Sequence, residues 1–239
     1  MAFKLHTDRS YESDLQEVRN RILLMAGHVE HMIAASVRAL SDRDPDLARD
    51  TIAIDAKVNQ AECETDELCL IILAKRHPMA SDLRFVTLAL KMVTDLERIG
   101  DLAVNICERA IDLSKVPPLR SYEDIHRMAD IVQSMVRDAI DAFVDRTVER
   151  AETVIERDDE VDKLYDRVFG EILEVMVNDR DAIQRGIHFQ SVAKWLERMA
   201  DHSTNLAEQV IFMIKGKDIR HPGKLGATSL RGRREPSSS

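Results

Sequence analysis

Apolar and polar positions alternate with a helical period along most of this 239-residue chain. Between residues 86 and 111, apolar side chains recur every three or four positions, as at Val86, Leu90 and Val93, and the stripe resumes at Val104. Such spacing places one apolar stripe on the face of an α-helix. Only eight glycines and six prolines interrupt the chain, so the pattern predicts long helices and few loops.

Six helices are predicted from the few helix breakers. Asp44 and Pro45 form a start signal, an N-cap residue followed by proline at the first helical position. Ser81 is expected to open the third helix, Ser121 to cap the fourth, and Gly216 to end the sixth. The predicted helices cover about 10–42, 45–75, 78–114, 121–145, 149–177 and 178–215.

An internal repeat divides the chain into two halves. The segment Leu96–Asp101 matches Leu196–Asp201, and Pro117 with Pro118 marks the boundary between the two copies. We therefore predict an all-α fold made of two tandem repeats of an antiparallel three-helix bundle. The predicted domains are one bundle at residues 1–116, a second at 117–217, and a basic tail at 218–239.

Composition and charge limit the setting and the partners. Aromatic residues make up 4% of the chain, which argues against a β-sandwich or barrel. The net charge of −9 argues against nucleic acid as the main partner. No apolar stretch approaches the roughly 20 residues of a membrane span, and the three cysteines form no CxxC pair. We therefore expect a protein of the reducing cytoplasm.

Carboxylates stand where the apolar stripe of the third helix should continue. The stripe extended beyond Val93 reaches Glu97 and Asp101, one turn apart, and the sixth helix repeats the pattern with Glu197 and Asp201. An unpaired carboxylate in a dry interior costs several kcal/mol. A positive group or water is therefore expected to face these side chains.

A second acidic line is predicted on the neighbouring helices. The second helix carries it on one face at Asp55, Asn59, Glu62 and Asp66. The fifth helix carries Asp158 and Asp162 in the matching place. Clusters of oxygen ligands suit hard or borderline cations such as Mg²⁺, Mn²⁺, Ca²⁺ or iron. Repetition of the pattern in both halves favours a metal site in each.

Two interpretations without metal stay open for the same carboxylates. One is a salt-bridge layer with Arg84, Arg98 and Arg198 as partners, and the other is a solvated groove. Both would satisfy the charges with side chains or water alone.

Weaker patterns add little. Glu123 and His126 form half of the Glu-x-x-His pattern of di-iron bundles, but Gly100 and Ala200 stand where a second half would need histidine. His202 follows Asp201 and offers a possible nitrogen ligand. No Walker loop, GxGxxG or GxSxG motif is present.

Three motifs closely resemble those of the PhoU family. They read Arg76-His77-Pro78-x-x-Ser81-Asp82-Leu83-Arg84, then Asp95-Leu96-Glu97-Arg98-Ile99-Gly100-Asp101, and Leu196-Glu197-Arg198-x-x-Asp201-His202. The resemblance covers about residues 5–222 and is consistent with the repeat. PhoU proteins regulate bacterial phosphate uptake and the phosphate regulon.

The resemblance implies a cytoplasmic negative regulator that is not an enzyme and is often a homodimer. It implies an adaptor between the transporter ATPase PstB and the sensor kinase PhoR. Association with the membrane would then be peripheral and would occur through these protein partners.

The resemblance also implies metal binding, because some members hold metal clusters through E(D)xxxD motifs. Iron, zinc, manganese and magnesium are the candidate ions. The implied ligands are Asp55, Asn59, Glu97 and Asp101 in the first half, and Asp158, Asp162, Glu197 and Asp201 in the second. Asn59 replaces a carboxylate, so the first site is expected to be the weaker one.

One alternative comes from a different class, a carboxylate-bridged metal enzyme or metal store. The missing Glu-x-x-His pair favours the adaptor over this alternative. The sequence shows no anion nest or convergent arginine cluster, so nothing in it argues for direct sensing of phosphate.

Overall fold

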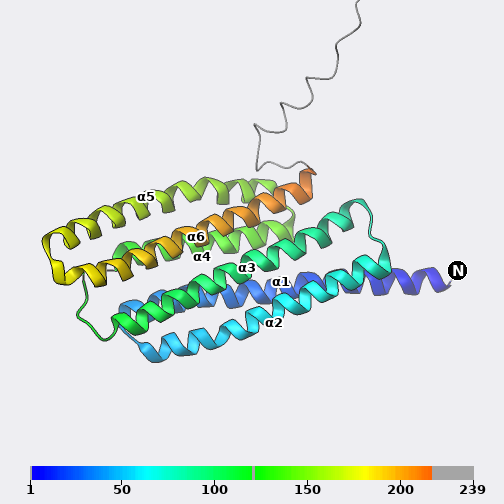
Figure 1. Ribbon diagram of the computed structural model, residues 1–239. Helices are drawn as coiled ribbons and strands as arrows, with labels where there is room; N and C mark the ends of the chain where they lie inside the picture. The colour runs from blue at the N-terminus through cyan, green and yellow to red at the C-terminus, as the bar shows by residue number, and fades with distance from the viewer. Residues whose placement is uncertain (1, 120–121, 217–239) are drawn as a thin grey trace, which may run out of the picture.

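The fold consists of six long α-helices and one short 3₁₀ turn. The computed structural model describes residues 2–119 and 122–216 (Figure 1). The elements are α1 (Ala2–Asp42), α2 (Pro45–Arg76), α3 (Ala80–Leu113), α4 (Glu123–Asp145), α5 (Val148–Asn178), η1 (Arg180–Ala182) and α6 (Ile183–Lys215). The predicted all-α fold is confirmed, and the predicted tail at 218–239 lies outside the described residues.

Two of the predicted helix boundaries are confirmed by their capping geometry. The Asp44 carboxylate accepts hydrogen bonds of 3.0 Å from the backbone N–H groups of Asp46 and Leu47, and Pro45 occupies the first helical position. Gly216 ends α6 with φ +66°, a left-handed conformation that glycine adopts without strain.

Other helix ends differ from the prediction. α1 begins at Ala2 rather than near residue 10, since neither glycine nor proline interrupts that stretch. Ser81 does not cap α3, because the N-cap is Met79 and makes no side-chain hydrogen bond. Asp179 caps η1 instead of α6, so a 3₁₀ turn precedes the last helix. Ser121 lies outside the described residues.

The helices form two three-helix groups that lie side by side (Figure 1). α1, α2 and α3 all pack on one another, while α6 packs on both α4 and α5, and α4 on α5. α3 packs on α6 and α1 packs on α4, and these two contacts join the groups. Helices of about 30 residues extend for about 45 Å, so both groups are elongated.

One continuous apolar core runs through both groups. Met92, Leu96 and Ile99 of α3 are fully buried, as is Met32 of α1. Phe85 of α3 stacks on Phe143 of α4, with ring centroids 5.7 Å apart. Because buried aromatic side chains dominate core energetics, this stack ties the two groups into one unit.

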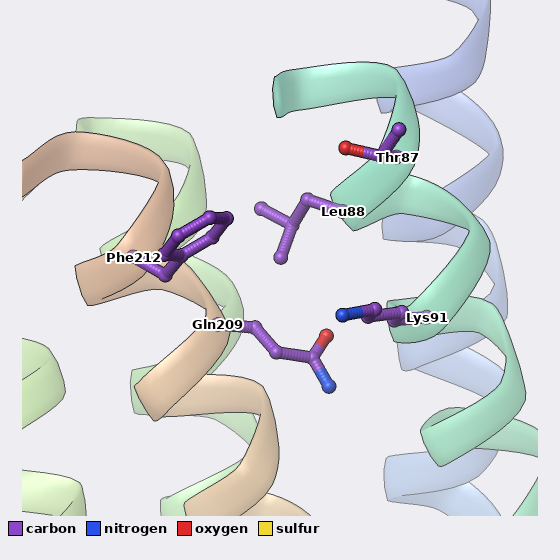
Figure 2. Close-up of a pocket in the computed structure, with 5 residues that line it drawn as sticks. All are labelled: Thr87, Leu88, Lys91, Gln209 and Phe212. Carbon is purple, nitrogen blue, oxygen red and sulfur yellow. The ribbon is translucent and has the colours of Figure 1, made fainter. Parts of the chain in front are cut away.

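Polar contacts complete the seam between the two groups. Asp95 of α3 lies 2.9 Å from His202 Nδ1 and accepts a 2.7 Å hydrogen bond from Gln209 Nε2, both on α6. A cavity of about 20 Å³, room for about one water, lies beside Gln209. Figure 2 shows Leu88 directed toward Phe212 there, and Lys91 toward Gln209.

Two exposed glycines lie inside helices at positions where packing does not require a glycine. A Cβ atom added at Gly27 in α1 or at Gly170 in α5 would meet no atom within 4 Å. We predict that Gly27→Ala and Gly170→Ala each stabilise the protein by about 0.5–1 kcal/mol, because alanine has the higher helix propensity. Thermal unfolding of the single and double variants measures this, and the two gains should add. A lower melting temperature in either variant would contradict it.

Candidate functional site

The first acidic cluster lies between α2 and α3. Asp55 and Glu62 come from α2, and Glu97 and Asp101 from α3. The helices come close here, since a Cβ atom added at Gly100 would lie 3.7 Å from Asp55 Oδ1. Helical spacing and close packing therefore bring these four carboxylates together across two helices.

The environment of this cluster disfavours negative charge. Burial raises the pKa of Glu97, and the nearby carboxylates of Asp101, Glu62 and Asp55 raise it further. Burial also raises the pKa of Asp55 and of Glu62, with Asp101 adding to both. The Glu97 side chain is only 17% exposed, whereas that of Asp101 is 44% exposed. The cluster therefore sits at the edge of the core, in contact with water.

Asn59 occupies its predicted place and hydrogen-bonds to a carboxylate of the cluster. Its side-chain amide donates a 2.8 Å hydrogen bond to Asp55 Oδ2, and the residue is exposed. This bond favours the ionised form of Asp55 and partly offsets the burial that raises its pKa. Glu62, which the expected ligand set did not include, faces the α3 carboxylates instead.

The second cluster lies between α5 and α6. Asp158 and Asp162 come from α5, and Glu197 and Asp201 from α6. Burial raises the pKa of Asp158 to about 6, with the charges of Asp162, Asp201 and Glu197 adding to it. Burial likewise raises the pKa of Asp162 and of Asp201, and Glu197 adds to both. The structure thus brings all four predicted residues together.

Few cations compensate these charges. Arg98 lies 3.6 Å from Glu97 and 3.8 Å from Asp101, while Lys194 forms an ion pair with Glu197. Of the three arginines considered for a salt-bridge layer, only Arg98 pairs with a cluster carboxylate among the described residues. Arg84 donates to the backbone oxygen of Met213 in α6, and the exposed Arg198 makes no ion pair with the described residues.

Two carboxylate oxygens on α2, one of them in the first cluster, also lack hydrogen-bond partners among the described residues. Asp55 Oδ1 and Asp66 Oδ1 are buried atoms without a donor. Such atoms fit a cation-binding role, because a hard cation would satisfy them. In the part of the chain that is described, however, no three His, Cys, Asp or Glu side chains are already arranged to hold a metal ion.

The weaker histidine candidates do not join either cluster. His202 is directed to Asp95 on the seam with α3, at 2.9 Å, and not to the α5 carboxylates. His126 is exposed on α4. Residues 2–119 and 122–216 contain no helix long and apolar enough to cross a bilayer.

Comparison with known proteins decides the family. The sequence profile of the PhoU domain matches residues 22–110 and 125–210. The chain belongs to the PhoU family. The two PhoU matches fall on either side of the Pro117-Pro118 pair, and each contains one of the acidic clusters.

Relatives with curated names share most of their length with this PhoU chain. The phosphate-specific transport system accessory protein PhoU homolog of Pseudomonas aeruginosa is 39% identical over 91% of this chain and 90% of its own. The homolog of Pseudomonas putida is 38% identical over 91% of this chain and 86% of its own.

Solved PhoU structures share the fold. The crystal structure of PhoU from Pseudomonas aeruginosa has a TM-score of 0.84 at 38% identity and covers 87% of this chain and 100% of that one. The phosphate transport system regulatory protein PhoU from Streptococcus pneumoniae has a TM-score of 0.80 at 26% identity, over 87% of this chain and 99% of that one.

The raised pKa of Asp158 predicts a pH-dependent stability effect. Ionisation of Asp158 is less favourable in the folded state than in the unfolded state. Its contribution to the free energy of unfolding therefore falls as the pH rises from 3.8 to about 6. With a metal chelator in the buffer, Asp158→Asn should raise the free energy of unfolding at pH 7.5 by about 1–2 kcal/mol. This value is smaller than the pKa shift alone would give, because solvent screens the charges.

Urea unfolding of Asp158→Asn at pH 7.5 and pH 4.5 tests this effect. The gain should shrink at the lower pH, where the wild-type carboxyl is itself protonated. Asp130→Asn, on the exposed face of α4, is the control for the same change of charge. An equal gain at both pH values, or an equal gain in the control, would contradict the electrostatic cause.

Proposed function

We propose that this protein is a negative regulator of the phosphate regulon and of phosphate-specific transport. The observation that carries the proposal is the match to phosphate-specific transport system accessory proteins, at 38–39% identity over 91% of the chain. The match covers both three-helix groups, so the similarity concerns the whole architecture and not a shared fragment.

The mode of action that we propose is that of a helical adaptor rather than an enzyme. It would act in the cytoplasm, as a homodimer, between a PstB-type transporter ATPase and a PhoR-type sensor kinase. The two acidic clusters support this mode, because among the described residues they form ion pairs only with Arg98 and Lys194 and would attract basic partner surfaces. Attachment to the membrane would then occur through these proteins.

We further propose that both acidic clusters bind metal ions, with iron, zinc, manganese or magnesium as candidates. Asp55, Glu97 and Asp101, joined by Glu62, would hold the ion in the first group. An ion bound there would neutralise mutual repulsion and draw the two helices together.

The second cluster would supply Asp158, Asp162, Glu197 and Asp201. Its affinity should be the lower of the two, because Lys194 already neutralises Glu197. This reverses the ranking expected from Asn59 alone, since Glu62 restores a fourth carboxylate to the first cluster.

The regulatory role is tested by deleting the gene. Reporter expression from phosphate-starvation promoters should stay high in phosphate-rich medium, and the full-length chain supplied on a plasmid should restore repression. Normal repression in the deletion strain, with no second copy of the gene present, would contradict negative regulation.

Metal binding is tested by removing the α3 or the α6 carboxylates. Manganese titration of chelator-treated protein should show the larger loss of affinity for Glu97→Ala/Asp101→Ala and a smaller one for Glu197→Ala/Asp201→Ala. The matched control removes the exposed Glu152 and Glu156 from α5, which share the i, i+4 spacing.

Unchanged metal content in both cluster variants would overturn the metal assignment. The alternative of a metal enzyme or store predicts oxidase activity in iron-loaded protein, and its absence would favour the adaptor. The half-formed Glu-x-x-His pattern supports that absence, because the exposed His126 stands apart from both clusters.

A further inference from the structure

A cationic cavity lies at the junction of the two helical groups, away from both acidic clusters. Its volume is about 190 Å³. It is lined by Ser81, Arg84, Phe85, Arg146, Met213 and Ile214. These residues come from α3, from the corner between α4 and α5, and from the last turn of α6, so only the folded chain assembles the cavity.

Neither arginine in this cavity is neutralised by a carboxylate. Arg84 uses only its Nε, in a 3.3 Å hydrogen bond to the Met213 backbone oxygen, which leaves both terminal nitrogens for another acceptor. The exposed side chain of Arg146 makes no hydrogen bond or ion pair with the described residues. Two guanidinium groups therefore border one cavity, and neither forms an ion pair with a carboxylate among the described residues.

The internal repeat gives Arg146 a counterpart that makes different contacts. Its counterpart is Arg43, which also ends the first helix of its group in a left-handed conformation. Arg43 Nη2 donates to the backbone oxygens of Ser114 and Val116, at 2.7 and 2.6 Å. Arg146 makes no such bond with the residues that the structure describes, so the same position bonds the backbone in one half and not in the other.

The remaining groups at the cavity carry both signs. Ser81 lies at the start of α3, where no side chain caps the helix and the helix dipole is positive, and its hydroxyl donates a long, 3.4 Å hydrogen bond to Asp82 Oδ1. On the far side of Phe85 and Arg146 lies a second cavity of about 120 Å³. It contains Arg19, whose buried Nε has no partner, together with Glu12 and Asp82. Asp82 accepts a hydrogen bond from the Tyr11 hydroxyl and so is directed to α1.

We propose that the cavity formed by Ser81, Arg84 and Arg146 binds a phosphate group. Guanidinium groups match the geometry of phosphate oxygens, and a dianion would neutralise both arginines at once. The volume admits a tetrahedral ion with several waters, each of about 30 Å³. The ligand is free inorganic phosphate or the phosphate group of a small phosphomonoester. The proposal rests on this cavity and not on the proposed regulatory role.

Calorimetric titration of the full-length protein tests the site. Inorganic phosphate and glycerol 3-phosphate are the two probes, and chloride at matched ionic strength corrects for screening. We expect saturable binding of phosphate, and Arg84→Gln or Arg146→Gln should weaken it about tenfold or more, as for the loss of a charge-assisted hydrogen bond. Binding of both probes indicates a phosphate-group site, and binding of phosphate alone indicates a site for the free ion.

Matched variants keep the test independent of folding. Arg49→Gln removes the same charge from an exposed arginine that pairs only with Asp46, and it should change affinity less than twofold. Arg84→Lys keeps the charge but not the fork of donors and should bind with intermediate affinity. The proposal is overturned if neither probe binds, or if Arg49→Gln weakens binding as much as the cavity variants. If the protein binds no phosphate but still represses the phosphate-starvation promoters, this proposal fails while the proposed regulatory role stands.

Discussion

The apolar packing of α3 offsets the repulsion among the carboxylates that this helix and its neighbours carry. Leu96 and Ile99 are fully buried on either side of Glu97, and each such side chain contributes about 1.5–3 kcal/mol on burial. Interactions between partly exposed charges are worth about 1 kcal/mol or less. Packing therefore exceeds repulsion, and the helices stay together with an acidic cluster at their edge. The same balance holds in α6, where Leu196 and Met199 flank Glu197.

The helical period separates two polar faces on α3. Asp95 contacts α6 across the seam, whereas Glu97, two residues later and about 200° around the helix, joins the cluster with α2. α3 is thus apolar between its two polar faces and packs on α1, α2 and α6. A cation that neutralises the cluster would change the charge beside the helix that also forms the seam. The two groups are therefore joined by packed helices, α3 on α6 and α1 on α4, and α3 and α6 each also carry cluster carboxylates.

Local sequence signals predicted the fold, and contacts between distant segments limited the prediction of the site. Asp44 and Gly216 end their helices as expected, because capping depends on neighbours in the chain. The hydrogen-bond partners of Asn59 and Arg84 were not predictable in this way. The amide of Asn59 donates to Asp55, and Arg84 donates to a backbone oxygen of α6, 129 residues away. The sequence showed no convergent arginine cluster because Arg84 and Arg146 meet only after the two groups pack.

The two halves keep one architecture and differ in their charged side chains. Lys194 takes the place of Thr94 and pairs with Glu197, and Tyr165 takes the place of Glu62 and contacts Lys194 at 5.3 Å. The second cluster thus carries its own cation, while the first relies on Arg98 at longer distances. Arg43 and Arg146 differ in the same manner, because Arg43 bonds backbone oxygens and Arg146 makes no hydrogen bond with the described residues. Because the backbone is repeated, these differences alter the electrostatics of each half without altering the fold.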